Sequence, residues 1–349
     1  MFSGERFRYG VLAGLLLFTA PAFAQDQQAA LPDPSYLPTE GHLITDTSVS
    51  FQRNSNLNLA EQLVEFNGSS YIVSWGPNDK YRSDLYSVGQ AFQYGVTDDL
   101  VVGLSESCGY QSQNFNNYTY FGTSYTSEEK GGGCGDPTLT VIYRGLHQSE
   151  LPDFPLNVDL AASVSPGLIK QSLDHPSTSQ GGTTGDVNLA LSHVFDDVTV
   201  LGRVGLSIQG KAVANADGET RDTSAYLRSY LQGLAQYRPV EDLFLMLGAE
   251  VVPSFDLKQS LRYYDFYFGG QYEDDTKTKV GYSTSPFFRA SYVIIPDLLA
   301  ASLTYQHTFG GDQKVYDAAY NFFAPGSPTE QYIHNAGDAV SLNFRVLWF

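Results

Sequence analysis

The chain has 349 residues, a formal net charge of -18, two cysteines, 24 tyrosines and 22 phenylalanines. Nucleic acid is excluded as a partner, because its phosphates need lysine and arginine on a chain that is strongly acidic instead. Apart from the N-terminus, no apolar run approaches the roughly 20 residues of a membrane helix, which excludes a helical inner-membrane protein.

Residues 1–24 have the pattern of a secretory signal peptide. Arg6 and Arg8 precede a short apolar run, and Ala22 and Ala24 form a small-x-small cleavage site. The sequence therefore predicts an exported protein that begins near Gln25. Removing Arg6, Arg8 and Glu5 changes the formal charge from -18 to -19.

The remainder divides into two parts. Residues 25–41 are rich in Gln, Ala and Pro and predict a periplasmic N-terminal lead-in rather than packed structure. Residues 42–349 alternate apolar and polar side chains in segments of about a dozen residues, which is typical of strands. We predict twelve of them, at 42–53, 84–96, 99–112, 135–145, 155–167, 185–195, 197–211, 223–238, 242–256, 278–294, 297–310 and 337–349.

The connections between these strands alternate in length. Tight turns are expected at 97–98, 196, 239–241 and 295–296, with a longer one at 146–154, whereas every connection at the opposite end is a long polar loop. Short periplasmic turns and long extracellular loops are typical of outer-membrane barrels, in which an even strand number places both termini in the periplasm. The fold class expected is therefore all-β, a transmembrane antiparallel up-and-down β-barrel in the outer membrane of a Gram-negative bacterium.

A soluble β-sandwich would show the same alternation of faces, with the apolar face buried. The signal peptide, the one-sided long loops and the aromatic C-terminus, Trp348-Phe349, favour the membrane barrel instead. Two residues do not fit this simple pattern. Glu106 shares the face of Val102 and Leu104, so either a bulge near Gly103 turns it inward or the expected register is off by one; Phe349 lies opposite the apolar stripe that ends at Trp348.

Three sequence segments resemble those of a known family. Tyr94-Gly-Val-Thr-Asp-Asp-Leu100, Gly135-Asp-Pro-Thr-Leu139 and Gly185-Asp-Val-Asn-Leu189 resemble the outer-membrane family described as "MetA pathway of phenol degradation", which is related to FadL-type channels for hydrophobic compounds. The resemblance covers roughly residues 80–349. It implies a passive channel for small molecules, aromatic ones among them, and supplies no catalytic residues.

Cys108 and Cys134 are the two cysteines, an even pair in an exported chain. They flank the loop expected at 113–134, near the outer ends of two neighbouring strands. A disulfide between them would staple that loop. Two free thiols or a metal-binding pair are the alternatives, and no histidine lies nearby in the sequence to support a metal.

Charged residues recur on the polar face of the strands and are candidates for a lumen constriction, which can set the selectivity of a channel. The alternative is a structural network in which opposite charges pair. The candidates are Asp159, Arg203, Arg228, Glu250, Arg289 and Arg345.

The stretch from Asn58 to Phe66 could form one or two helical turns. These turns would either fold into the lumen and narrow it or pack outside, against the external or lipid side of the barrel. A barrel hydrolase would need a serine beside a histidine with a third, orienting group. The pair His175 and Ser177 lacks a third member, and His193 and His307 have the lipid-facing parity, so we expect no enzyme, no cofactor and no metal.

The expected function is an outer-membrane channel for passive passage of small solutes. A plugged surface barrel whose extracellular loops bind a partner is the alternative, and a lipid hydrolase is a third hypothesis. The expected partners are outer-membrane lipid and lipopolysaccharide, the barrel assembly machinery during biogenesis, and a small-molecule solute. We expect a monomer.

Overall fold

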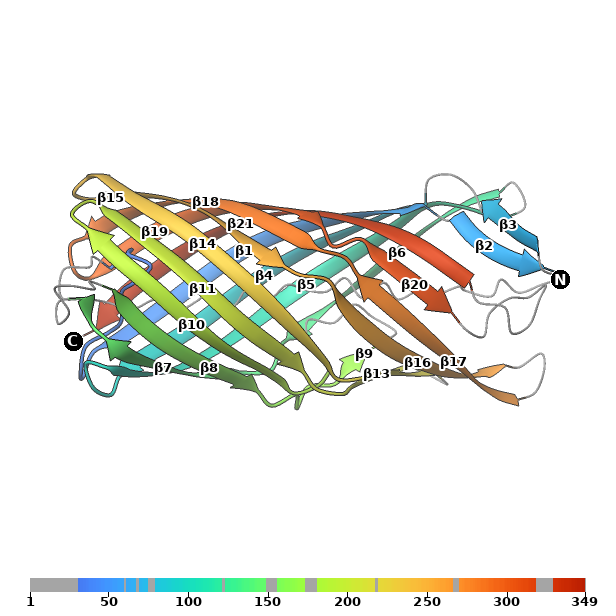
Figure 1. The fold of residues 1–349 in the computed structure, drawn as a ribbon, viewed down its shortest axis with the longest axis horizontal. Helices are drawn as coiled ribbons and strands as arrows, with labels where there is room; N and C mark the ends of the chain where they lie inside the picture. Colours follow the sequence, from blue (N-terminus) through green and yellow to red (C-terminus); the bar gives the residue numbers. More distant parts are fainter. Residues whose placement is uncertain are drawn as a thin grey trace.

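The computed structural model describes residues 31–59, 61–66, 69–74, 79–120, 123–148, 156–172, 181–216, 219–265, 270–317 and 329–348. Within these ranges no helix is long and apolar enough to cross a membrane. Twelve long strands instead form one closed antiparallel barrel (Figure 1). Closure is made by β1, which pairs with β4 on one side and with β21 on the other.

Each of the twelve strands overlaps a strand that the sequence predicts, so the predicted barrel of twelve strands is confirmed, although β1, β4, β5 and β21 extend several residues into the connections expected as loops. The strands are β1 (Leu43–Leu59), β4 (Asp79–Gly95), β5 (Leu100–Tyr120), β7 (Thr138–Leu146), β8 (Asn157–Ser165), β10 (Thr184–Phe195), β11 (Val198–Gln209), β14 (Tyr226–Val240), β15 (Leu243–Val252), β18 (Ser283–Ile295), β19 (Leu299–Gly310) and β21 (Thr329–Trp348).

The predicted tight turns are also confirmed, and they all lie at one end of the barrel. The turn after β4 is closed by a hydrogen bond from the Val96 amide to the Leu100 carbonyl, 2.8 Å. The turn after β18 is closed by a hydrogen bond from the Leu298 amide to the Ile295 carbonyl, 3.1 Å. Asp297 in this turn has a φ of 56°, a left-handed conformation that Asp adopts more readily than most residues. Of the longer connection expected at 146–154, residues 149–154 lie outside the described residues.

At the other end the structure differs from the sequence-based expectation of long loops. Much of this chain is strand that extends the barrel wall or pairs beside it: β6 (Thr123–Cys134), β9 (Gln171–Ser172), β12 (Ala212–Ala216), β13 (Glu219–Thr223), β16 (Phe255–Asp265), β17 (Gly270–Val280) and β20 (Gln313–Asp317). These segments were predicted to be loops because they are polar. In the structure a neighbouring strand provides hydrogen-bond partners for their backbone groups, and a strand whose side chains face water can be polar without loss of stability.

The prediction of a helical turn between Asn58 and Phe66 is wrong. The chain there forms β2 (Glu61–Phe66), which pairs with β3 (Ser69–Ser74) in a separate two-stranded sheet. An isolated helix this short is marginal in water, whereas the hairpin gives each strand a partner for its backbone groups.

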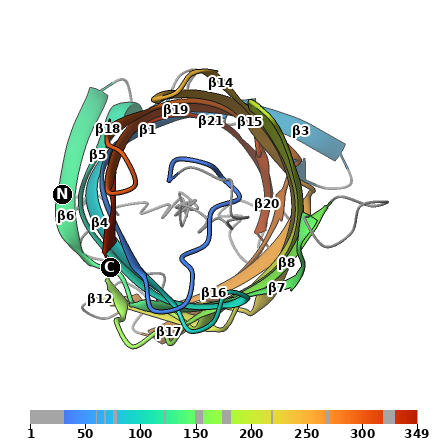
Figure 2. The same cartoon turned by 90° about the vertical axis from the view of Figure 1, so that its left-hand side faces the viewer.

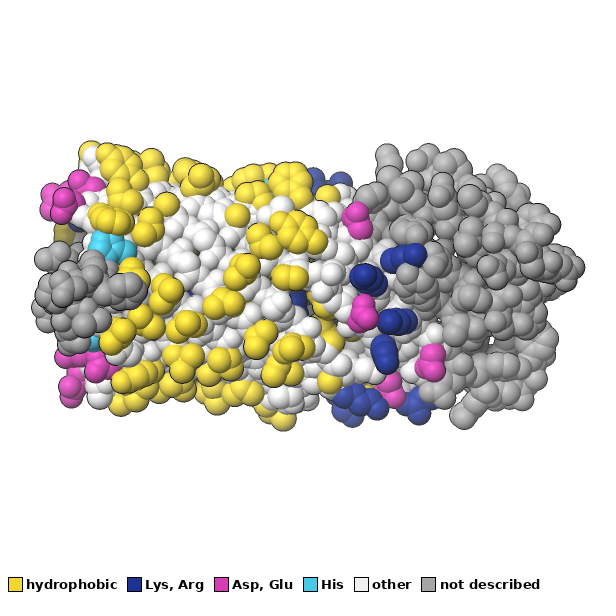
Figure 3. Space-filling view, in the orientation of Figure 1, with side chains coloured by type: hydrophobic (Ala, Val, Ile, Leu, Met, Phe, Trp, Pro, Cys, Tyr) yellow, Lys and Arg dark blue, Asp and Glu magenta, His cyan; other side chains and the backbone are white. Residues whose placement is uncertain are grey.

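The barrel is apolar outside and polar inside. Every one of the twelve barrel strands places a large apolar side chain, between 39% and 66% exposed, on the outer surface: Val49, Val88, Leu104, Leu139, Leu160, Leu189, Val204, Leu231, Leu247, Phe288, Leu303 and Leu342. Figure 3 shows apolar side chains in a broad band on the face in view. A soluble sandwich would bury this face, so that alternative is overturned; the exterior suits lipid.

Glu106 lies on the outer face together with Val102 and Leu104, all three being exposed. The β4–β5 pairing runs from Gly95 and Val101 to Lys80 and Asn116 without a register shift. The bulge suggested near Gly103 is therefore absent from this pair, and the expected register was correct. Phe349 lies outside the described residues, while Trp348 points outward and donates a hydrogen bond to the Thr45 hydroxyl, 3.0 Å.

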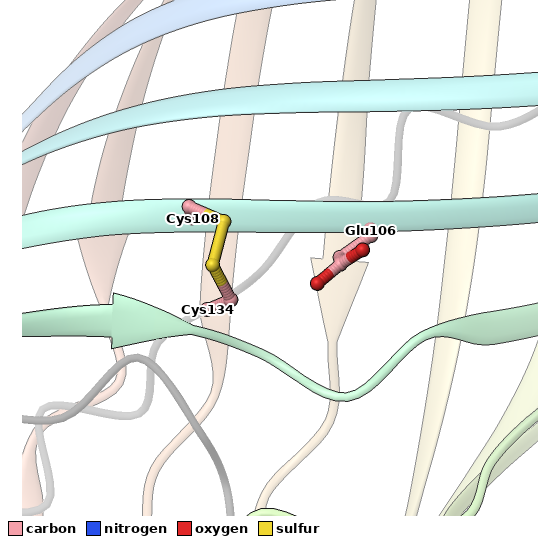
Figure 4. Close-up of side chains that lie close together, drawn as sticks. All are labelled: Glu106, Cys108 and Cys134. Atoms are coloured by element: carbon pink, nitrogen blue, oxygen red, sulfur yellow. A yellow bond between two sulfur atoms is a disulfide. The ribbon is translucent and has the colours of Figure 1, made fainter.

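The predicted disulfide between Cys108 and Cys134 is present, and the two residues are directly opposite on β5 and β6. Glu106 lies beside it (Figure 4). These three residues form the one His, Cys, Asp and Glu group within the described chain that has the spacing of a metal site. Because the two sulfurs are bonded to each other, they are not available as thiolate ligands, and the metal alternative is wrong in this state.

We predict that the Cys108→Ser/Cys134→Ser variant loosens the β5–β6 hairpin without unfolding the barrel. Closing a ring across the 26-residue separation stabilises it by about 3 kcal/mol in the chain-entropy model. Limited proteolysis between residues 109 and 133 should become at least tenfold faster, while heat-modifiable migration on gels, which reports the barrel, stays unchanged. Equal proteolysis of the two proteins would show that strand pairing alone holds the hairpin.

Candidate functional site

The inner face of the barrel is the candidate site, and it carries all six predicted residues. Side chains two apart on a strand share a face, and each of the six shares its face with buried or partly buried inward neighbours. The six are Asp159, Arg203, Arg228, Glu250, Arg289 and Arg345. Asp159, Arg203 and Glu250 are buried, at 5%, 9% and 8% exposure.

Arg144 and Asp159 form a fully buried ion pair between β7 and β8. The Arg144 Nε lies 2.8 Å from Asp159 Oδ1, and its Nη2 lies 3.1 Å from Oδ2, so the contact is bidentate. The same Nη2 donates to the Ser35 carbonyl, 3.2 Å. Asp159 was predicted as a site residue and Arg144 was not, although Arg144 shares the inward parity of Ile142 and stands opposite Asp159.

A second ion pair joins the first and last strands of the barrel. Arg345 on β21 contacts Asp46 on β1 with Nε–Oδ1 at 2.8 Å and Nη2–Oδ2 at 3.1 Å. Its Nη1 donates to the Leu31 carbonyl, 3.2 Å. Asp46 was also missed, because only the pairing of the two chain ends brings it opposite Arg345. Nearby, Arg289 donates from Nε to the Thr304 hydroxyl, 3.0 Å.

Residues 31–38 enter the lumen at the end with the short turns. Figure 2 shows this segment, in blue, inside the ring of strands. Leu31, Ser35 and Leu37 are 3%, 0% and 1% exposed, and Leu31 and Tyr36 pack against Ile44, Ala300 and Leu347 of the wall. The prediction of an unpacked lead-in is therefore wrong for these residues. It was based on their Pro-rich composition and gave no weight to the apolar side chains that pack against the wall.

Asp33 holds the segment to the wall. Its Oδ2 accepts hydrogen bonds from the Thr199 hydroxyl, 2.5 Å, and from the Gln236 side-chain amide, 3.3 Å. Its Oδ1 accepts from the Ser35 amide and hydroxyl, 2.7 and 2.6 Å, which tightens the turn. Burial raises the pKa of Asp33, and the hydrogen bonds from Ser35 and Thr199 oppose that rise. With Arg144 and Arg345, Asp33 gives the segment three polar anchors on the inner wall.

Farther along the lumen lies a polar layer around Arg203. Arg203 stands opposite Gln232 across β11 and β14, with Nη1 to Oε1 at 3.4 Å, and Gln232 stands opposite Glu250 on β15. Tyr230 donates to Asp186, 3.0 Å, and its ring fills the space above Gly205. Arg228 lies on the same inner face as Glu250 and Asp186. The layer therefore contains both positive and negative side chains.

An apolar cluster separates this layer from Arg289. It consists of Leu201, Leu234 and Met246, with Phe287 packed against them over Gly248. Leu201, Leu234 and Met246 are buried, so Phe287 is the member of this cluster that is only partly covered. It lies on the inner face between the arginines of the polar layer and Arg289.

Of the residues named as hydrolase candidates, the structure describes His193 and His307, which lie on β10 and β19. His193 contacts Phe195 edge to face, and His307 pairs with Asp338 on the outer surface, 2.7 Å. His175 and Ser177 lie outside the described residues.

The comparisons with known proteins give fold neighbours and no family. No family model and no curated protein sequence matches the chain. It is similar to an outer membrane channel from Pseudomonas putida F1, with a TM-score of 0.49 and 13% identity over 93% of this chain and 100% of that chain. It is also similar to a Pseudomonas aeruginosa FadL homologue, with a TM-score of 0.38 and 8% identity over 88% and 90% of the two chains.

The outer membrane protease OmpT from Escherichia coli is a further neighbour, with a TM-score of 0.33 and 10% identity over 89% of this chain and 98% of that chain. An outer membrane channel, a FadL homologue and a protease are thus among the matches. This likeness is too distant to assign a function.

Proposed function

We propose that the protein is an outer-membrane channel through which small solutes cross by diffusion. The observation that carries the proposal is a closed barrel of twelve strands whose outer face is apolar on every strand and whose inner face is charged. An eight-stranded barrel is just filled by its own side chains, and wider barrels leave an interior space. Closure also pairs the backbone groups of every wall strand, as a lipid environment requires.

The residues that line the lumen favour small amphipathic molecules as solutes, aromatic acids among them. Phe287, the partly buried member of the apolar cluster, can contact an apolar ring, and the flanking guanidinium groups of Arg203 and Arg289 suit a carboxylate. The barrel would act as a monomer with outer-membrane lipid around it, after insertion by the barrel assembly machinery.

The test is a recording of the refolded protein in planar bilayers, with and without benzoate. Discrete conductance steps that benzoate blocks would support both the channel and its solute class. A folded barrel that stays electrically silent would contradict the proposal. It would favour the surface barrel whose extracellular segments bind a partner, an alternative consistent with residues 31–38 in the lumen.

We predict that Arg289→Gln shifts the ion selectivity of this channel toward cations. Arg289 has a hydroxyl as the hydrogen-bond partner of its Nε, so its charge is less locally neutralised than that of Arg345, which is bonded to Asp46. The reversal potential in a salt gradient measures the change. Arg262→Gln, on the outer surface, is the matched control, and an equal response of the two variants would mean that Arg289 does not face the permeation path.

A further inference from the structure

Half of the chain's eight lysines lie together on the outer surface of three adjacent strands. Lys258 on β16 is directly opposite Lys277 on β17, and Lys279 on β17 is directly opposite Lys314 on β20. We call these four residues the lysine patch. Like charges placed directly opposite on neighbouring strands destabilise a sheet, so two such pairs side by side point to an anionic ligand.

The patch faces outward. Lys258, Lys277 and Lys279 are exposed, whereas their sequence neighbours Leu257 and Thr278 are buried on the inner face, at 6% and 4% exposure. Lys314 shares the outer face because it pairs with Lys279. The side chains of Lys258, Lys277 and Lys279 therefore face molecules outside the barrel.

Acidic neighbours neutralise this surface only in part. Asp256 lies 3.4 Å from Lys277, and both side chains are more than half exposed, so this pair is weak. Asp222 pairs with Lys211 at 3.3 Å and with Arg262 at 2.5 Å. Among the described side chains on this outer face, six cations face four carboxylates: Lys211, Lys258, Arg262, Lys277, Lys279 and Lys314 against Asp222, Asp256, Asp275 and Asp312. The local excess is two positive charges on a chain whose net charge is -18.

The patch lies just beyond the apolar belt. Along β18 and the residue before it, the belt runs from Tyr282 to Ile294, both exposed on the outer face. The twelve steps between these two residues span roughly 30 Å along the barrel axis, at about 3.3 Å per residue and a tilt of about 40°. This length matches a hydrocarbon core of about 30 Å. Lys279 is three residues beyond Tyr282, and Figure 3 shows basic side chains gathered where the apolar band ends.

We propose that the lysine patch binds the phosphates of lipid A, the phosphorylated glycolipid anchor of lipopolysaccharide. The patch is at the end of the barrel opposite the short turns, so it faces the outer leaflet. Ammonium groups are point charges that suit phosphate, and the adjacent belt is available to the acyl chains. The inference rests on the proposed membrane placement and not on channel activity.

The experiment measures binding of lipid A to the refolded full chain in detergent micelles. The Lys277→Gln/Lys279→Gln variant is compared with the matched control Lys130→Gln/Lys170→Gln, which removes the same charge elsewhere on the outer part of the protein. We expect the patch variant to bind about 25-fold more weakly, at about fivefold for each lysine near an anionic surface, and the control to change less than twofold. Lys277→Arg/Lys279→Arg should keep the affinity.

Dephosphorylated lipid A separates headgroup recognition from contact with the acyl chains. If it binds the wild type as tightly as lipid A does, or if the patch and control variants weaken binding equally, the proposal is overturned. Should the glutamine variant fail to refold, a salt titration of the wild type decides, because phosphate recognition must weaken as salt screens it. Conductance of the patch variant should match the wild type, so a failure here is distinguishable from a failure of the channel proposal.

Discussion

Replacing Arg144 with methionine should destabilise the barrel by about 3–5 kcal/mol, which is the usual cost of leaving one charge of a buried pair without its partner. The Arg144 side chain is 0% exposed and that of Asp159 is 7% exposed, so Asp159 would keep a charge that water reaches poorly. Arg144 also supplies the donor to the Ser35 carbonyl, and that acceptor would lose its partner too. The free energy of unfolding, measured by urea titration of the refolded protein in lipid vesicles, gives the change.

Arg238→Met is the matched control. Arg238 pairs with Asp197 at 3.1 Å in a short turn, where the two side chains are 34% and 57% exposed, and exposed pairs contribute about 0–1 kcal/mol. The double variant Arg144→Met/Asp159→Leu removes both charges and should recover most of the lost stability. If Arg144→Met costs no more than Arg238→Met, water must reach Asp159 and the pair is not buried in the working protein.

The strands of the barrel wall could be predicted because the sequence of each strand alone shows where it runs and which of its faces is apolar. The alternation around Leu160, Val204 or Leu247 specifies a face, and turns such as Thr97 to Asp99 specify where a strand ends. These are local signals with a period of two residues, so twelve independent segments gave twelve strands. The outward position of Glu106 followed from the same parity, and the suggested bulge was unnecessary.

The contents of the lumen could not be predicted in the same way. Asp46 and Arg345 are 299 residues apart in the chain, and only closure of the barrel brings them together. Residues 31–38 have no periodic pattern, so their seat inside the barrel depends on Arg144, Thr199, Gln236 and Arg345, which belong to four different strands. The outer hairpins were missed for a related reason, since polar strands and polar loops have similar compositions.

Asp33→Ala should release the segment of residues 31–38 and open the lumen. The substitution removes the acceptor for Thr199 and Gln236, the two wall residues that bind this side chain. A hydrogen bond to a charged group contributes about 1.5–3 kcal/mol, and about 1.4 kcal/mol corresponds to a tenfold change in an equilibrium. The open probability in single-channel recordings should therefore rise more than tenfold. Thr199→Val, which removes one donor, should have a smaller effect in the same direction.

The converse experiment fixes the segment in place. The pair Asp33→Cys/Gln236→Cys, made in a Cys108→Ser/Cys134→Ser background, joins two side chains that touch in the wild type. Conductance should be low after oxidation and should rise after reduction, because only the new bond is reducible. If Asp33→Ala, the oxidised pair and the wild type all conduct alike, solutes pass the segment without its release. The constriction must then lie farther along the lumen, at the polar layer of Arg203, Gln232 and Glu250.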